Sequence, residues 1–341
     1  MFPINICPAT LQPGYATYSP KALRYLFNGR KVSHVLPMAS PNNEGMSSKP
    51  FFDNRSRISI SGVQVKYSLK LDKNKLVLTD SGGEFILKPI PDNLMNVSQV
   101  PANEHLTMQI AEQVYGMSTA KNALIFFEDG TPAYLTKRFD VKRDGTRCLK
   151  EDFASLALLT EENAGTSFKY NYSYLQMAEL IDHFFPASIP AKERFFQLVV
   201  FNYLFSNGDA HLKNFGRIDC EGTGFGMLAP AYDLVCTRLH IEDGDFALHD
   251  RLYEKDYEHP SYAHYGYHAY DDFYDFGLKM GLLPVRVQRI LNSFLHKTEA
   301  VEALVANSFL SPTMRQQYLH WYHDKLRRLQ TSMRGLKTAI G

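Results

Sequence analysis

The pattern of apolar and polar positions predicts a strand-rich region between residues 58 and 140. From Val63 to Leu71 every second residue is apolar, which is the period of a half-buried strand. We expect hairpin turns at residues 80–83 and 128–130 and a helix over residues 101–116. Four more apolar segments bounded by turn residues are typical of strands: 75–79, 84–89, 123–127 and 133–139. This region therefore predicts a small α+β lobe.

After about residue 150 the helical period dominates. An earlier, isolated helix is expected at residues 19–27, where Ser19 can cap the helix and Pro20 can take its first position. The turn-rich residues 206–238 interrupt the helical part. Further helices are expected at 152–159, 173–185 and 191–205, with two or three more between residues 284 and 337.

These patterns together predict an α+β fold of two lobes. We expect an N-terminal extension at residues 1–57 that packs on the N-terminal lobe, a nucleotide-binding N-terminal lobe at 58–150 and a helical catalytic lobe at 151–341. At 341 residues the chain is long enough for two lobes with a substantial core.

Composition and charge limit the classes of function. Lys and Arg number 37 against 36 Asp and Glu, so no overall positive field holds the chain on nucleic acid or an anionic membrane. No apolar run approaches the roughly 18 residues of a membrane span, and the first residues lack the features of a secretory signal. The four cysteines form no CxxC pair, which predicts neither a zinc knuckle nor a disulfide framework. We expect a reduced, cytoplasmic protein without direct nucleic-acid or membrane contact.

The densest polar chemistry lies in the turn-rich interruption. Asp209, His211, Lys213 and Asn214 fall within six residues, and Asp233 follows nineteen residues after Asn214. Such a set is costly to gather between apolar elements unless something occupies it. Phosphoryl transfer uses these groups, because a carboxylate accepts the acceptor's proton, a lysine offsets phosphate charge, and Asn and Asp hold Mg²⁺ through oxygen. The structural alternative is that Asp209 and Asn214 only cap a helix and close a turn.

The strand-rich lobe carries the complementary groups. Lys88 ends an apolar strand, from which it can reach nucleotide phosphates, and Glu104 in the next helix is its natural partner. Small, polar and basic residues surround the start of the first strand, where a phosphate-covering loop would lie: Ser59, Ser61, Gly62 and Lys66. The arrangement matches the plan of protein kinases, although the motifs GxGxxG, HRD and DFG are missing from the sequence.

The residues of these motifs resemble those of one family, the HipA toxin kinases. Six segments carry the resemblance in the family's order, over about residues 15–330: Ser59–Lys66, Ile86–Pro89, Asn103-Glu104, Lys137–Asp140, Asn207–Asn214 and Ala231–Leu234. The resemblance implies a two-lobed, protein-kinase-like fold and a serine/threonine protein kinase that uses ATP and Mg²⁺. The chain begins close before the nucleotide lobe, and in this it is most similar to the short HipT form of three-part HipB–HipS–HipT systems.

The same resemblance implies roles for individual residues. Asp209 would be the catalytic base, with His211 and Lys213 completing the catalytic loop, and Asn214 and Asp233 would hold Mg²⁺. Lys137, Arg138 and Phe139 would contact adenine through their backbone, Asp140 would reach the ribose, and Ser59 and Ser61 would be autophosphorylated. The full set of expected ATP-binding residues is Gly62, Gln64, Lys66, Lys88, Glu104, Lys137, Arg138, Phe139 and Asp140.

The resemblance also implies partners and a biological role. We expect a HipS-like small antitoxin and a HipB-like DNA-binding protein. The implied substrate is an aminoacyl-tRNA synthetase, with a tryptophanyl-type enzyme favoured over a glutamyl-type one, and its phosphorylation would arrest translation and growth. Two alternatives stay open. One is a small-molecule kinase, since Asp-x-x-x-x-Asn loops also occur in antibiotic and sugar kinases, and the other is an inactive kinase-like co-regulator of transcription.

Two further segments have composition without a clear motif. Residues 249–274 contain four histidines and seven tyrosines, and because Pro260 and Gly266 argue against a helix, we expect a tyrosine-rich surface loop rather than a metal site. The basic residues of 315–337 are expected on a solvated helix face.

Overall fold

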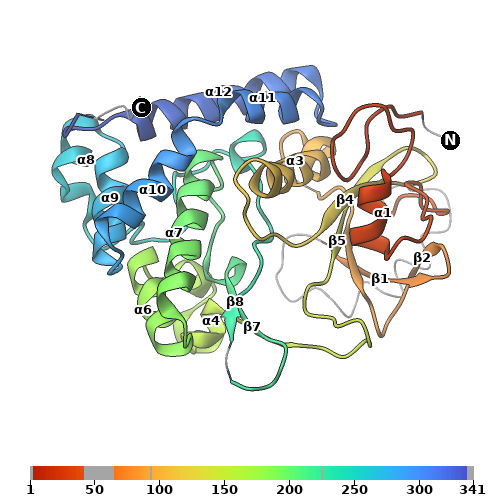
Figure 1. Cartoon of the computed structure of the whole chain (residues 1–341), viewed down its shortest axis with the longest axis horizontal. Helices are drawn as coiled ribbons and strands as arrows, with labels where there is room; N and C mark the ends of the chain where they lie inside the picture. Colours follow the sequence, from red (N-terminus) through yellow and green to blue (C-terminus); the bar gives the residue numbers. More distant parts are fainter. Residues whose placement is uncertain (1–2, 42–64, 93, 225, 336–341) are drawn as a thin grey trace.

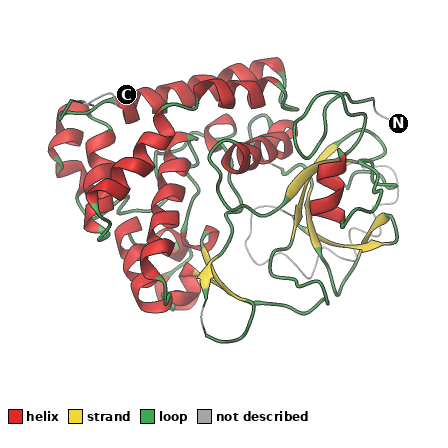
Figure 2. Cartoon of the chain, viewed as in Figure 1, coloured by secondary structure: helices red, strands yellow, loops and turns green. Residues whose placement is uncertain are grey.

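The computed structural model describes residues 3–41, 65–92, 94–224 and 226–335. Strands gather at one end of the molecule and helices at the other, and the two parts lie side by side (Figures 1 and 2). Helix α3 (Val100–Gln113) lies between them. The expected α+β architecture of two lobes is present.

The strand-rich lobe is built on a five-stranded antiparallel sheet in the order β2-β1-β3-β5-β4. Its strands are β1 (Tyr67–Asp72), β2 (Lys75–Leu78), β3 (Phe85–Lys88), β4 (Asn122–Phe126) and β5 (Pro132–Lys137). The hairpin predicted at residues 128–130 joins β4 to β5, as expected.

The hairpin predicted at residues 80–83 is wrong. Leu69 of β1 lies opposite Leu78 of β2 on one side and opposite Phe85 of β3 on the other, so the turn carries the chain from one edge of β1 to the other. The physical reason is burial. Phe85 and Leu87 are completely buried and require a central strand, which a local turn signal cannot reveal.

The N-terminal residues share the core of this sheet. Helix α1 (Pro20–Phe27) begins as predicted, with the Ser19 hydroxyl accepting a hydrogen bond from the amide of Ala22 and Pro20 at the first position. Phe27 packs on Phe85, with ring centroids 5.6 Å apart. Residues between Cys7 and Leu36 therefore contribute to the core of this lobe.

Helix α3 is buried along almost its whole length, which fits its position between two layers. Leu106, Met108 and Ile110 belong to the core of the helical part. Two polar side chains of α3 form hydrogen bonds on opposite sides of the helix. The Asn103 amide donates to the Cys236 carbonyl at 2.9 Å, while Gln109 donates to Asn122 of β4 at 3.1 Å.

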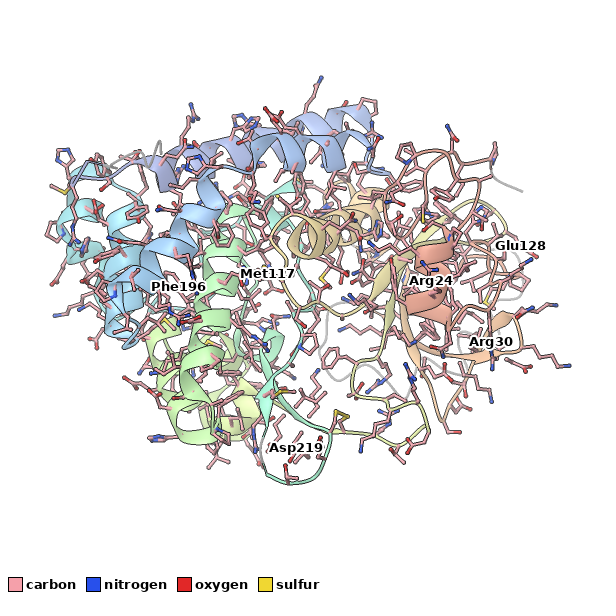
Figure 3. All side chains as sticks on the ribbon, viewed as in Figure 1. Arg24, Arg30, Met117, Glu128, Phe196 and Asp219 are labelled. Atoms are coloured by element: carbon pink, nitrogen blue, oxygen red, sulfur yellow. A yellow bond between two sulfur atoms is a disulfide. The ribbon has the colours of Figure 1, made fainter. Side chains whose placement is uncertain are left out.

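The helical lobe forms around α7 (Ser188–Leu204), whose Phe195, Phe196, Val200 and Phe201 are completely buried; Figure 3 shows Phe196 among the helices. Its other helices are α4 (Phe153–Leu156), α5 (Glu161–Ala164), α6 (Tyr174–Phe184), α8 (Pro260–Tyr265), α9 (Tyr270–Lys279), α10 (Pro284–Leu295), α11 (Thr298–Ala306) and α12 (Pro312–Gln330). Short 3₁₀ turns are η1 (Val97–Gln99), η2 (Phe168–Tyr170), η3 (Leu212–Asn214), η4 (Thr237–Leu239) and η5 (Asp256–Glu258). A small antiparallel sheet of β6 (Leu149–Asp152), β7 (Gly216–Asp219) and β8 (Met227–Leu228) lies beside the lobe junction.

The surface loop predicted for residues 249–274 is wrong, because this segment forms α8 and the start of α9. Pro260 takes the first position of α8, and Gly266 ends it in the left-handed conformation with φ +74°. The imidazole of His268 bonds the Asp256 carboxylate at 2.7 Å in the interior. In the part of the chain that the structure describes, no group of three or more His, Cys, Asp or Glu side chains is placed to hold a metal ion.

The basic face of α12 is only partly solvated, which corrects the expectation for its segment. Lys325 is completely buried and forms an ion pair with Asp245, which also pairs with Arg238 at 2.7 Å and Arg328 at 3.3 Å. Within the ranges described above, no helix has both the length and the apolar character that a membrane crossing requires.

Cys148 and Cys220 form a disulfide, so the expectation of a reduced protein without a disulfide is wrong. The two residues are 72 positions apart, yet they extend the ladder of β6 and β7 by one pair beyond Leu149 and Asp219. Tertiary pairing, and not spacing, brings them together. Figure 3 shows Asp219 where β7 runs into its loop.

Removal of this crosslink should destabilise the protein. We expect Cys220→Ser to lower the free energy of unfolding by roughly 2–4 kcal/mol, because the disulfide restricts the unfolded chain. Thermal unfolding followed by circular dichroism checks this, with reductant lowering the melting temperature of the wild-type protein and leaving Cys220→Ser unchanged. Four titratable thiols in the unreduced, denatured wild-type protein would contradict the crosslink.

Candidate active site

Lys88 is the charged group around which the site is arranged. Its ammonium lies 2.7 Å from Oε1 of Glu104 and 2.5 Å from Oδ1 of Asp233, and its residue is only 5% exposed. The Tyr134 ring packs on the same ammonium, with its centroid 5.3 Å away. The sheet, helix α3 and the loop before η4 therefore meet at one buried positive charge.

The pKa values in this cluster depend on burial and on the fact that the two carboxylates share the one ammonium of Lys88. Burial disfavours the charged form of Lys88, yet Asp233 and Glu104 outweigh it and raise the pKa of Lys88. Burial alone would raise the pKa of Asp233, but Lys88 and then Lys66 hold it well below its ordinary value. Burial dominates at Glu104 and raises its pKa despite Lys88. Asp233 is thus the firmly ionised carboxylate of the pair.

The backbone around Asp233 is fixed from both lobes. Asp233 has φ +57°, the left-handed region that Asp tolerates better than most residues. The Tyr232 hydroxyl donates to the Lys213 carbonyl at 2.9 Å, which joins this segment to the loop that carries Asp209. Three residues further on, Asn103 donates to the Cys236 carbonyl at 2.9 Å and accepts from the Cys236 amide at 3.2 Å.

The loop that carries Asp209 is held by the side chain of Thr237 in η4. Thr237 accepts a hydrogen bond from the Gly208 amide at 2.9 Å and donates to the Ser206 carbonyl at 2.9 Å. Gly208 lies against the carboxylate of Asp243, so a side chain at this position would force Asp243 to move. The loop ends at η3, which contains Asn214.

Asn214 and Asp233 lie together, as two ligands of one cation should. The Asn214 Nδ2 amide lies 3.4 Å from Oδ2 of Asp233, and its Oδ1 accepts a hydrogen bond from the His211 amide at 3.2 Å. An ionised carboxylate beside an amide fits the oxygen ligands of Mg²⁺. For both to bind one ion, the Asn214 amide must turn its oxygen toward Asp233.

Asp209 and His211 lie at the open side of this cluster. The Asp209 side chain is 49% exposed, and its Oδ1 accepts a hydrogen bond from the Tyr170 hydroxyl at 2.9 Å. Burial raises the pKa of Asp209, opposed by Tyr170 and Lys169. Burial also lowers the pKa of His211 to about 3, so its imidazole is neutral near pH 7. The 3.9 Å approach of His211 to Asp209 is therefore not an ion pair.

The other predicted ATP-binding residues are placed unevenly. The positive charge of Lys66, just before β1, lowers the pKa of both Glu104 and Asp233. The ammonium of Lys213 lies 5.9 Å from the centre of the Phe168 ring. Ser59, Ser61, Gly62 and Gln64 lie outside the described residues.

Several groups expected to contact adenine and ribose already form hydrogen bonds within the protein. The amides of Lys137 and Arg138 donate to the carbonyls of Lys121 and Glu84 at 2.7 and 2.8 Å, so Phe139 is the member of this trio proposed to offer an amide to adenine. Asp140 accepts two hydrogen bonds from the Arg138 guanidinium, at 3.0 and 2.5 Å. A ribose hydroxyl would have to share that carboxylate.

Three residues of the site were missed by sequence reasoning. Tyr170 lies 39 positions before Asp209, and no local signal connects them. Lys150 packs its ammonium 4.3 Å from the Tyr232 ring centre and 5.3 Å from that of Phe139, at the lobe junction. Asn103 directly precedes Glu104. A polar side chain such as Asn103 in a buried helix needs a hydrogen-bond partner, and this could have indicated its structural role.

Two cavities lie away from this cluster. One of about 390 Å³ is lined by Val32, Leu36, Leu76 and Phe127 among others, and one of about 150 Å³ by residues including Met117, Arg194 and Leu228. Neither is lined by Lys88, Asp209 or Asp233. The candidate site is therefore defined by its charged groups and their geometry.

Comparison with known proteins gives the family and the fold. The family model described as HipA-like C-terminal domain matches residues 58–302. A protein of Haemophilus influenzae named "Putative kinase" is 26% identical over 341 residues, covering 95% of this chain and 97% of its own. "Putative kinase Y4dM" of Sinorhizobium fredii is 32% identical over 210 residues, covering 57% of this chain and 48% of the relative, so the match spans about half of that protein.

Among solved structures, HipA of Shewanella oneidensis, determined in complex with HipB and operator DNA, has a TM-score of 0.60 at 20% identity. The match covers 80% of this chain and 65% of that one. The expected two-lobed, HipA-like fold is therefore confirmed.

The shared ammonium of Lys88 predicts a non-additive mutant cycle. Lys88→Met should lower the free energy of unfolding by about 3–5 kcal/mol, because buried Glu104 and partly buried Asp233 then lose their counter-charge. Adding Glu104→Gln should recover part of this loss, since only Asp233 is left unpaired. Urea unfolding of the variants measures both effects. Lys121→Met is the matched control, because its pair with Glu112 is 40% and 27% exposed and should contribute about 1 kcal/mol or less. Purely additive effects of Lys88 and Glu104 would contradict the coupling.

The neutral state of His211 is testable by NMR. With a pKa of about 3 against an ordinary 6.5, the imidazole should stay unprotonated from pH 8 to pH 5. The unfolded chain takes up the proton first as the pH falls, so this residue's contribution to stability is lost between about pH 6.5 and pH 3. Side-chain ¹⁵N spectra, with His211→Asn to assign the signal, measure the titration. A midpoint near 6.5 would refute the neutral state.

Proposed function

The chain belongs to the family of proteins with a HipA-like C-terminal domain, and on this premise we propose that it is a Mg-ATP-dependent serine/threonine protein kinase, the toxin of a bacterial toxin–antitoxin system. The observation that carries the proposal is the convergence of Lys88, Glu104 and Asp233 beside Asn214 and Asp209. An ion pair with only a structural role would not require the half-exposed carboxylate of Asp209 or the side-chain amide of Asn214, whose oxygen can bind a metal ion.

Each residue has a defined task in this mechanism. Lys88 binds phosphate oxygens, Glu104 holds its ammonium in place, and Asp233 and Asn214 hold Mg²⁺. Mg-ATP, when bound, supplies the transferable γ-phosphoryl group and neutralises its charge. Asp209, with its side chain 49% exposed, accepts the proton of a seryl hydroxyl that enters from solvent. Neutral His211 supplies no positive charge that would keep Asp209 from taking that proton.

The finer parts of the proposal rest on the resemblance of the motifs. We propose that the acceptor is a seryl residue of an aminoacyl-tRNA synthetase, tryptophanyl-type before glutamyl-type, and that its modification arrests translation. We also propose autophosphorylation at Ser59 and Ser61, a cytoplasmic location, and neutralisation by HipS-like and HipB-like partners. The complex of the Shewanella HipA with HipB supports the last point only through the shared fold.

Phosphoryl transfer should depend on Asp209. The purified protein is incubated with γ-labelled ATP, Mg²⁺ and separately purified tryptophanyl- and glutamyl-tRNA synthetases, beside a bacterial lysate. Asp209→Asn should lower the transfer rate about 10²- to 10⁴-fold, because the general base is lost. Asp275→Asn, which removes a partly exposed carboxylate paired with Lys279 on α9, is the matched control and should keep full activity.

The outcomes distinguish the competing functions. One labelled synthetase, absent with Asp209→Asn, supports the toxin kinase. Consumption of ATP with label only in small molecules would identify a small-molecule kinase. A complete lack of transfer with the wild-type protein would favour the inactive co-regulator. Mass spectrometry of the wild-type protein and of Asp209→Asn tests Ser59 and Ser61, and equal phosphate on both would exclude autophosphorylation.

A further inference from the structure

Tyr170 contacts the proposed base and has no role in the function described so far. Its hydroxyl donates a hydrogen bond of 2.9 Å to Oδ1 of Asp209. Among the hydrogen bonds of the described residues, this is the one that a side chain donates to the Asp209 carboxylate. No side chain of the described residues donates a hydrogen bond to the other oxygen, Oδ2, and the Asp209 side chain as a whole is 49% exposed.

The phenol is held in this place by several contacts. Tyr170 ends η2, its amide donates to the Ser167 carbonyl at 2.9 Å, and its carbonyl accepts from the His249 amide at 2.9 Å. Its ring packs edge-on against His211, with centroids 5.3 Å apart and planes at 74°. The Lys169 ammonium lies 4.8 Å from the centre of the same ring. The hydroxyl is therefore a fixed donor and not a mobile surface group.

A carboxylate on a loop needs such a donor to act as a base in one orientation. A free carboxylate rotates about its terminal torsion, whose energy minimum is broad, and so presents its oxygens in many directions. Anchoring one oxygen fixes the direction of the other, which is the general way in which a neighbouring group orients a catalytic one.

We propose that Tyr170 is a positioning residue of the phosphoryl-transfer site, holding Oδ1 of Asp209 so that Oδ2 faces the acceptor hydroxyl. This inference rests on the proposed kinase function. Tyr170 itself exchanges no proton with the substrate and acts through Asp209 alone.

The charges around Asp209 determine how loss of the Tyr170 hydrogen bond would change the pH dependence of the reaction. Burial and the like charge of Asp233 raise the pKa of Asp209, whereas the Tyr170 hydrogen bond and Lys169 lower it. His211 is neutral, and Asp243, which lies against Gly208, acts on Tyr170 itself. Without the phenol, the pKa of Asp209 rises further. Because the base must be ionised, the acidic limb of the pH–rate profile then moves to higher pH.

The test compares Tyr170→Phe with the wild-type protein and with Tyr172→Phe. Tyr172 lies in the same segment and loses the same hydroxyl, but it makes no hydrogen bond to Asp209 among the described residues. We expect Tyr170→Phe to lower kcat roughly tenfold, which is the value of about one charge-assisted hydrogen bond. The KM for ATP and the calorimetric affinity for Mg-ATP should stay unchanged, and the acidic limb should move to higher pH. Tyr172→Phe should match the wild-type protein in each measurement.

Three results would overturn the inference. An unchanged kcat and pH profile in Tyr170→Phe would show that the bond does not position the base. A higher kcat would show instead that the phenol blocks the acceptor's place. Equal losses in Tyr170→Phe and Tyr172→Phe, together with a lower melting temperature in both, would show a structural role. A wild-type protein without phosphoryl transfer would refute the proposed function itself, so the two failures are distinguishable.

Discussion

The structure depends on one buried ammonium that is shared by two carboxylates. Removing such charges from water costs several kcal/mol each, so the arrangement is stable only when all three partners are in place. Lys88 comes from the central strand of a sheet, Glu104 from a helix between the lobes and Asp233 from a loop that follows the catalytic loop. The two lobes therefore cannot take up their relative position independently of this cluster. The same cluster is the part of the molecule that a phosphate and a divalent cation would rearrange, because the phosphate would compete with the carboxylates for Lys88 and the cation would compete with Lys88 for Asp233.

Sequence reasoning worked best where local pattern and chemistry coincide. The alternation in β1 and the capping residues of α1 follow from the chain alone, and the polar set from Asp209 to Asp233 was identified by residue type. It failed where the result depends on which distant segment lies alongside. The edge of β1 that β3 would join, the pairing of Cys148 with Cys220 and the contact of Tyr170 with Asp209 are all long-range, and their residues carry no local mark.

The segment after residue 249 illustrates a different failure. Proline and glycine were interpreted as evidence against a helix, yet Pro260 begins α8 and Gly266 ends it. Both residues disfavour a helix interior, and both favour its ends. The tyrosines of this region were expected at the surface, but Tyr270 is largely buried, because α9 packs against α10 and the core of the helical lobe. Composition alone does not distinguish a helix boundary from a loop.

The way in which α3 is held has a consequence for control of the site. The helix bonds Cys236 through Asn103, Tyr318 through Thr107 and Asn122 through Gln109, so it is fastened to both lobes. A swing of α3 that withdrew Glu104 from Lys88 would break buried hydrogen bonds on two sides at once. On–off regulation by rotation of this helix is therefore energetically unfavourable in this chain.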